Sequence, residues 1–245
     1  MAQLKGTRIR VSFTNINRTP IPEEYHYEVR NMILKKIQES NQILSQSVHD
    51  NWNKFLTFSG FLGKQWETPN GLVFKNIDII LASPDADIIS VLKNSFLINH
   101  KITLFNSVIL VNYVREINFE LKSGKNKISY ESLGEIVIKK ESENGKTLHV
   151  TEKDDVKSDL ENIIKKQYLA YSGREPVLNI DEVGIIRKKK SIVKNGIVSN
   201  SFIALRLKFN LEADEDVHSF ILTQGIGHHR KMGFGMVGIR NGEIK

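Results

Sequence analysis

The chain has 245 residues, a length that admits one large domain or two domains of about 100–150 residues each. Lysine and arginine number 35 against 28 aspartate and glutamate residues, so the formal charge is +7 and a polyanion is the first partner to consider. The sequence contains no cysteine, which excludes disulfide scaffolds, thiolate nucleophiles, cysteine-ligated zinc and iron–sulfur centres.

The sequence also argues against secretion and membrane insertion. Its first residues lack the continuous apolar segment of a signal peptide. Apolar runs such as 108–111 are far shorter than the roughly 20 residues that a membrane-spanning helix needs. Because the absence of cysteine also fits a reducing compartment, we expect a soluble cytoplasmic protein with no membrane partner.

The first half of the chain alternates between strand and helix patterns. Residues 8–13 alternate strictly, with Ile9, Val11 and Phe13 on one face, as in a half-buried strand. The later expected elements are a helix from Glu23 to about Asn41, a short apolar stretch at 43–48 that ends in a loop at His49, strands 55–62 and 72–82 around a Pro69-Asn70-Gly71 turn, a helix begun by Ser83-Pro84, and strands 101–105 and 108–117. This order predicts a ferredoxin-like domain over residues 1–119.

The second half repeats this pattern loosely. We interpret the polar segment 120–132 as a linker and place a second domain at 133–245. Its expected elements are a strand at 135–139, a helix at 155–170, a hairpin that turns at Asn195-Gly196, a strand at 203–211, a short helix at 217–222 and a final strand at 234–240. The fold class is therefore α+β, with two tandem ferredoxin-like (RRM-like) domains and antiparallel sheets.

The densest cluster of polar and glycine residues is the segment 225–236. It does not match a nucleotide-binding loop, because no Gly-Lys-Ser/Thr follows and a strand, not a helix, comes after it. Glycines let backbone amides approach phosphates, and the basic side chains add charge. The RNA-binding candidates in it are Gly225, Gly227, His228, His229, Arg230 and Lys231. The alternative is a tight glycine turn with solvated charges.

The adjacent pair His228 and His229 lacks a third nearby ligand, so we predict no metal there and no cofactor elsewhere. The acidic runs 154–155 and 214–216 are interpreted as solvated helix starts.

A second cationic cluster lies on the predicted hairpin. Arg187, Lys188, Lys189 and Lys190 precede the turn, and Arg206 and Lys208 lie on the outward face of the neighbouring strand. Such a face would contact phosphates and bind in a salt-dependent manner. The alternative is an edge strand whose charges prevent aggregation.

His49 and Lys54 form the candidate catalytic pair. An imidazole that transfers protons and an ammonium that stabilises a developing phosphorane suffice for metal-free cleavage of RNA by its own 2′-hydroxyl. DNA lacks that internal nucleophile. The alternative is a structural histidine.

With the two halves, the His49 junction and the glycine-rich segment before Met236-Val237, nearly the whole chain resembles the CRISPR-associated endoribonucleases that cleave repeat RNA, the Cas6 family of the RAMP superfamily. Members bind precursor CRISPR RNA and cut each repeat without metal, leaving 2′,3′-cyclic phosphate and 5′-hydroxyl ends. The resemblance implies that His49 is the catalytic histidine and Lys54 the active-site lysine. Where some relatives place a tyrosine, this sequence has Leu34; Tyr27 and Arg30 share its helix face and are assigned no role.

The leading hypothesis is a metal-independent endoribonuclease specific for CRISPR repeats. One rival is a non-catalytic RNA-binding RAMP subunit of a CRISPR effector complex, and the other is a general nucleic-acid-binding module. The expected partner is CRISPR repeat RNA or its precursor, with other effector subunits and a second copy of the chain as further candidates.

Overall fold

The computed structural model describes residues 2–4, 7–105, 107–121, 123–142, 144–151, 154–194 and 197–240. Within these ranges, side chains are described except for 2–4, 187–194 and 197–201. None of the helices in the described part of the chain is long and apolar enough to cross a membrane.

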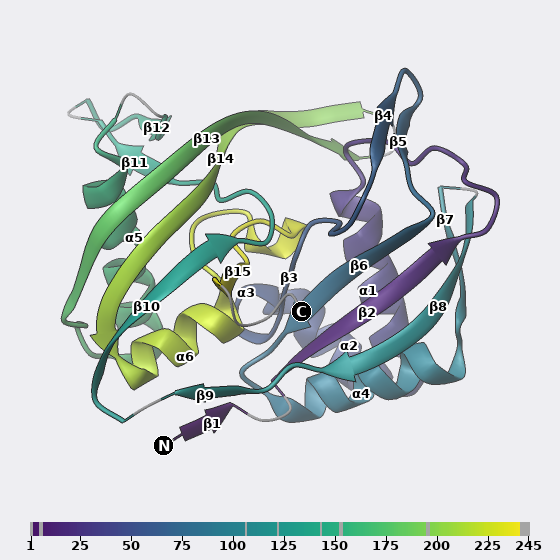
Figure 1. The fold of residues 1–245 in the computed structure, drawn as a ribbon, viewed down its shortest axis with the longest axis horizontal. Helices are drawn as coiled ribbons and strands as arrows, with labels where there is room; N and C mark the ends of the chain where they lie inside the picture. Colours follow the sequence, from purple (N-terminus) through teal and green to yellow (C-terminus); the bar gives the residue numbers. More distant parts are fainter. Residues whose placement is uncertain are drawn as a thin grey trace.

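The first half forms a five-stranded antiparallel sheet in the order β3-β6-β2-β8-β7 (Figure 1). Its strands are β2 Arg8–Asn15, β3 Thr57–Phe58, β6 Asn76–Ala82, β7 Lys101–Leu104 and β8 Ser107–Glu116. The helices are α1 His26–Ser40, α2 Gln42–Asp50, α3 Trp52–Phe55 and α4 Ala86–Ile98. Without the edge strand β7, this is the ferredoxin-like arrangement, which confirms the predicted order of elements.

The predicted strands at 55–62 and 72–82 are shorter in the structure. Phe55 ends α3. In the sequence, a separate hairpin of β4 Trp66–Thr68 and β5 Gly71–Val73 lies between β3 and β6. The turn at 69–71 closes this small hairpin rather than joining the two predicted strands. The helix start at Ser83-Pro84 was also misplaced: α4 begins at Ala86, because the Asp85 side chain caps it by accepting from the Asp87 amide at 2.9 Å.

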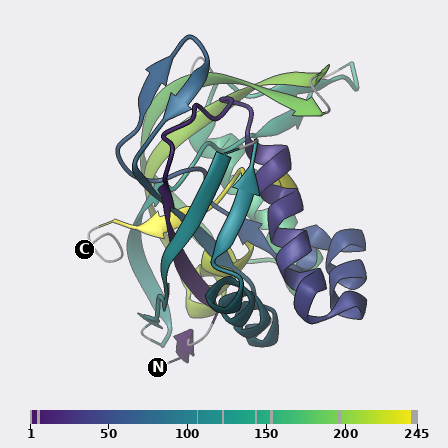
Figure 2. The ribbon, with the colours of Figure 1, turned by 90° about the vertical axis from the view of Figure 1, so that its right-hand side faces the viewer.

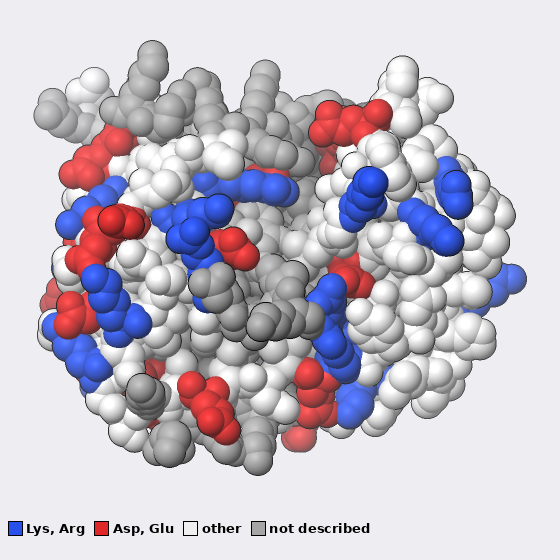
Figure 3. All heavy atoms as spheres, in the orientation of Figure 1, with Lys and Arg blue, Asp and Glu red and all other residues white. Residues whose placement is uncertain are grey.

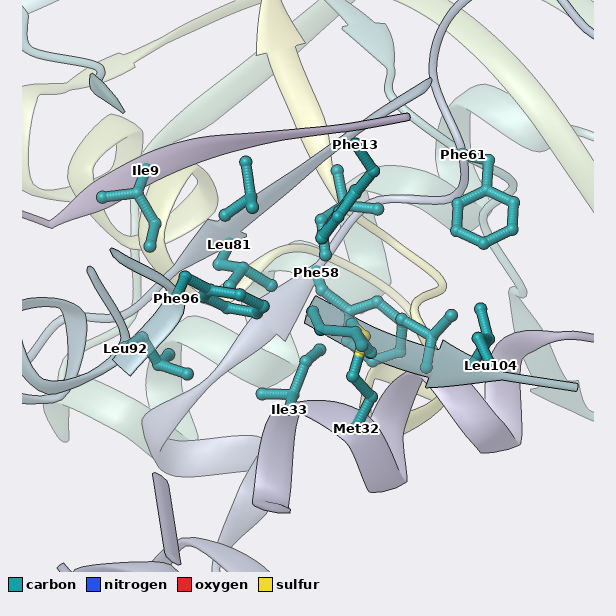
Figure 4. Packing of buried hydrophobic residues seen from close by; sticks show 14 of the residues in the cluster. Ile9, Phe13, Met32, Ile33, Phe58, Phe61, Leu81, Leu92, Phe96 and Leu104 are labelled. Carbon is teal, nitrogen blue, oxygen red and sulfur yellow. The ribbon is translucent and has the colours of Figure 1, made fainter. Parts of the chain in front are cut away.

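The core of the first half lies between the sheet and the helices α1 and α4 (Figure 4). Ile9, Val11 and Phe13 point into it as predicted and are at most 1% exposed. The rings of Phe13 and Phe96 meet edge-on, 6.0 Å apart, which joins β2 to α4. Figure 2 shows α1 and α4 on one face of this sheet, and neither of these two helices covers the opposite face.

The second half forms a four-stranded antiparallel sheet in the order β13-β14-β10-β15. Its elements are β10 Lys125–Ser132, α5 Val156–Ser172, β13 Leu178–Lys194, β14 Ile197–Asp214, α6 Glu215–Gln224, the 3₁₀ helix η1 Arg230–Met232 and β15 Val237–Ile239. The order β15-β10-β14-β13 is again ferredoxin-like, so the predicted tandem fold is confirmed.

Three expectations for the second half differ from the structure. The segment interpreted as a linker contains β10, a central strand of the second sheet, and β9 Phe119–Leu121, which pairs with β1 Ala2–Leu4. Residues 136 and 137 form only isolated bridges, before β11 Lys139–Glu141 pairs with β12 Thr147–His149. The final strand is limited to β15 because the preceding glycine-rich segment is turned. The predicted Asn195-Gly196 turn lies outside the described residues.

Arg8 joins the two halves. The alternation in β2 predicts it on the solvent face, but it is 1% exposed because the second half covers this end of the first sheet. Its Nη2 donates to the carbonyl oxygens of Leu222 and Val237, the latter at 2.9 Å. The guanidinium also lies 5.1 Å from the centre of the Phe119 ring. A buried cation of the first half therefore binds backbone of the second.

Arg8→Met is expected to lower the free energy of unfolding by roughly 3 kcal/mol, because it removes charged hydrogen bonds to buried carbonyls. Urea denaturation measures this loss. The control is Arg174→Met, which breaks an exposed ion pair with Asp216 and should cost about 1 kcal/mol or less. Equal losses in the two variants would show that Arg8 does not hold the halves together.

Candidate active site

His49 and Lys54 line one cleft of about 570 Å³. His49 lies in the last turn of α2, and Lys54 lies in the short helix α3 that follows after Asn51. The expected junction after His49 is therefore a break between two helices. Val48 of α2 and Trp52 of α3 are both buried in the core and fix their helices, which leaves His49 and Lys54 toward the cleft.

Side chains from two other elements complete the cleft. Tyr27 and Arg30 reach it from α1, and Lys231 and Met232 reach it from η1 in the second half. Tyr27 and Arg30 share one helix face, but no functional role was predicted for them. The signal that could have identified them is that face itself, since it is the one on which the family tyrosine would lie.

Asp50 orients the imidazole of His49. Its Oδ1 lies 3.1 Å from His49 Nδ1, and the His49 side chain is 54% exposed. Hydrogen bonds from Gln46 and His49 lower the pKa of the Asp50 carboxyl, so it is ionised at neutral pH. A neutral imidazole that donates from Nδ1 keeps Nε2 as its basic nitrogen.

The cleft has a surplus of positive charge. The guanidinium of Arg30 stacks over the Trp52 ring at 5.2 Å, and burial lowers its pKa while the nearby Tyr27 opposes that shift. Among the described residues, none of Arg30, Lys54 and Lys231 forms an ion pair with a carboxylate. The one acidic residue of the lining is Asp50. This arrangement favours an anion such as a phosphate.

Hydrogen bonds attach the glycine-rich segment to the helix that carries Lys54. Gln224 Nε2 donates to the Lys54 carbonyl at 2.7 Å, and Arg230 Nη1 donates to the Gln224 carbonyl at 3.0 Å. Burial lowers the pKa of Arg230 to about 10. Arg230, expected to bind RNA, is thus a partly buried group that links the segment to α3.

The other expected RNA contacts in this segment are used within the protein. The buried amides of Gly225 and Gly227 donate to Ile221 O and Gln167 Oε1, each at 3.0 Å, so they do not form the expected phosphate cradle. His229 stacks on Phe202 at 4.9 Å, and burial lowers its pKa to about 4; burial also lowers the pKa of His228. Both imidazoles are therefore neutral at pH 7 and add no charge. Lys231 is the charged side chain of this segment that lines the cleft.

The cationic cluster on the hairpin is described in part. Arg206 and Lys208 are exposed on β14 as predicted, and Arg206 Nε lies 3.4 Å from Oε1 of the buried Glu135, which offsets part of its charge. The backbone of residues 187–190 pairs with residues 202–205, but the side chains of Arg187, Lys188, Lys189 and Lys190 lie outside the described residues. No group of three or more His, Asp or Glu side chains that could hold a metal occurs in the described part of the chain.

Fold and cleft together define a class of protein, that of two tandem ferredoxin-like domains with a cationic cleft to which both contribute side chains. Residues 118–239, about half of the chain, match the family model described as "CRISPR associated protein Cas6, C-terminal". The chain belongs to the Cas6 family.

Solved structures agree with this fold. A Cas6-related protein from Pyrococcus furiosus is 19% identical, with a TM-score of 0.79 over 96% of this chain and 98% of that chain. A protein described as CRISPR associated protein Cas6 is 23% identical, with a TM-score of 0.73 over 98% of this chain and 100% of that chain. A third, described as an RAMP protein binding different RNA substrates, is 20% identical, with a TM-score of 0.75 over 96% of this chain and 100% of that chain. No match was found among curated proteins.

Proposed function

We propose that this protein is a metal-independent endoribonuclease that binds CRISPR repeat RNA and cleaves precursor CRISPR RNA. The observation that carries the proposal is the His49 cleft, which one oriented imidazole lines together with three cations, supplied by both halves of the chain, that form no ion pair with any described carboxylate. Membership of the Cas6 family supports repeat RNA as the substrate.

In the proposed reaction the 2′-oxygen attacks the adjacent phosphorus, and the bond from phosphorus to the 5′-oxygen breaks. The proton of the 2′-hydroxyl is lost and the leaving 5′-oxygen gains one, so the products are a 2′,3′-cyclic phosphate and a 5′-hydroxyl. His49 transfers protons, with Asp50 holding its ring. Lys54 stabilises the negative charge that develops on the phosphorane, and Arg30 and Lys231 bind the flanking phosphate oxygens.

The remaining cations are proposed to bind the rest of the repeat. Arg206 and Lys208 present positive charge on β14, and the cluster 187–190 is part of the paired strand β13. RNA affinity should therefore fall steeply as salt concentration rises. In this assignment residues 1–119 supply most of the catalytic groups, and residues 133–245 supply most of the RNA-binding groups.

Leu34 favours a second candidate function, a non-catalytic RNA-binding subunit of a CRISPR effector complex. Leu34 packs against the first core and, with His49, lines a separate cleft of about 810 Å³, but it does not line the cleft that holds Lys54 and Lys231. Tyr27 and Arg30, two turns and one turn earlier on α1, line that Lys54 cleft instead. The site therefore lacks the family tyrosine at its usual position, and catalysis depends on His49 and the cations.

Cleavage of labelled repeat RNA with and without EDTA tests the proposed function. We expect cleavage at the same rate in EDTA, cyclic-phosphate product ends, and no cleavage when the scissile nucleotide carries a 2′-deoxy substitution although binding persists. Loss of activity in EDTA would contradict the metal-free mechanism. Binding without cleavage would favour the effector subunit, and equal affinity for DNA and unrelated RNA would favour a general nucleic-acid-binding module.

A further inference from the structure

The cleft of about 810 Å³ that Leu34 lines is formed by α1 and α2 and adjoins the His49 cleft. The two helices lie side by side on the helix side of the first sheet (Figure 2). Both clefts are lined by His49, Asp50 and Asn51, so the imidazole of His49 lies on the boundary between them. A ligand that reaches His49 through the cationic cleft can therefore continue into this second cleft.

The two clefts differ in the chemistry of their linings. The His49 cleft contains the cations Arg30, Lys54 and Lys231, whereas no lysine or arginine of the described chain lines the second cleft. Figure 3 shows lysine and arginine side chains spread over the opposite side of the molecule. Because a phosphate group is held by positive charge, the second cleft suits a neutral part of a ligand rather than a phosphate.

Carboxamides are the commonest side chains of this lining, which contains Gln38, Gln42, Gln46 and Asn51, and we call it the amide cleft. Gln46 Nε2 donates to both oxygens of the Asp50 carboxyl at 3.0 Å, so the acidic group of the cleft already has a partner. The side chains of Gln38 and Gln42 are exposed and form no hydrogen bond within the described part of the chain. Each of these two therefore offers a donor and an acceptor to a ligand.

Two aliphatic side chains, one from each helix, add apolar surface to the amide cleft. Leu34 of α1 packs in part against the first core, and Ile43 of α2 is 85% exposed, more than any other large hydrophobic side chain in the described part of the chain. The side chain of Asn41 caps α2 by accepting from Leu44 N at 2.9 Å, which fixes the turn that carries Ile43. Apolar surface beside unpaired carboxamides matches a nucleobase, which has apolar faces and an edge of donors and acceptors.

We propose that the amide cleft binds one nucleobase of the repeat RNA, whose edge forms hydrogen bonds with Gln38 and Gln42. The face of the base packs against Leu34 and Ile43. The choice of an RNA base as ligand rests on the proposed function. Because the amide cleft adjoins His49, the bound base belongs to a nucleotide next to the scissile phosphate. The amide cleft then selects the base at the cut, whereas the cations of the His49 cleft bind phosphates of any sequence.

An abasic scan of the repeat RNA tests the proposal by binding alone. Each labelled RNA carries one abasic nucleotide and the 2′-deoxy substitution that prevents cleavage, and fluorescence anisotropy measures its affinity. At one position we expect the missing base to weaken binding about tenfold for the wild type, but only about twofold for the double variant Gln38→Ala/Gln42→Ala, which has already lost the hydrogen bonds. Asn94→Ala, at an exposed carboxamide on α4, is the matched control and should respond as the wild type does.

The comparison of the two proteins isolates the base contact, because a loss that arises from the structure of the RNA itself is the same for both. Equal responses of the wild type and the double variant at every position would overturn the proposal, and so would a differing response away from the cut. If Ile43→Ala changed the oligomeric state or lost a protein partner at unchanged RNA affinity, the cleft would be a protein-docking surface and the proposal would be wrong. Binding without cleavage would contradict only the proposed function, since the scan does not depend on cleavage.

Discussion

His49→Ala is expected to slow cleavage of repeat RNA by roughly a hundredfold to ten-thousandfold, the range that a positioned proton-transfer group contributes. The ring lies in the open cleft with Asp50 on Nδ1, so its removal deletes proton transfer and leaves the cations of the cleft in place. RNA affinity and the free energy of unfolding should therefore stay near the wild-type values. Single-turnover cleavage with excess protein measures the rate, and anisotropy measures the affinity.

The matched control for this variant is His100→Ala, which removes an exposed histidine between α4 and β7 that does not line the His49 cleft. It should cleave at the wild-type rate. Added imidazole should restore part of the rate of His49→Ala, since the cleft is open to a small base. A wild-type rate in His49→Ala would remove His49 from the mechanism and leave the cation cluster as an RNA-binding site.

Gly235→Ala is expected to lower the free energy of unfolding by about 3 kcal/mol, from a strained positive φ and an overpacked contact together. The residue has φ +86°, and a Cβ there would overlap the carbonyl oxygen of Ile226. Gly235 N also donates to Glu135 O at 2.9 Å, and its carbonyl accepts from Ile226 N at 2.8 Å. The turn cannot shift without moving the segment that carries Arg230 and Lys231, so cleavage should fall as well.

Gly173→Ala separates strain from overlap. Gly173 has φ +73°, but no atom lies within 4 Å of its hypothetical Cβ, so this variant carries the conformational cost alone, about 1 kcal/mol. Urea denaturation of both variants gives the comparison, and repeat cleavage should stay at the wild-type rate in Gly173→Ala. Equal losses of stability would mean that the contact with Ile226 is relieved by relaxation.

Several local features of the fold were predictable because they depend on periodicity. The alternation of Ile9, Val11 and Phe13 correctly places the inner face of β2, and Asp155 begins α5 where its capping side chain indicates. The order of strands and helices also leads to the tandem ferredoxin-like fold. The element boundaries were less predictable. β10 has the polar composition of a linker, and it is a strand because it pairs with β14.

The candidate site also has features that the sequence predicted and features that it did not. The residue types of His49 and Lys54 indicate the chemistry, and the structure brings the two into one cleft. The charges of the glycine-rich segment were harder to interpret, because a histidine counts as a potential cation in any sequence. Burial against Phe202 and the nearby cations makes His229 neutral, and only the fold brings those groups together.

Composition and hydrophobic period are properties of the chain alone, so they were enough to predict the class of fold, the net charge and the absence of cysteine chemistry. Three features depend on the tertiary structure: Lys231 of one half lines the same cleft as Lys54 of the other, Arg8 is buried between the halves, and a bulge in β8 turns Tyr113 outward. Each of these depends on contacts between residues far apart in the chain, and these contacts decide which charges are desolvated and which remain available to a ligand.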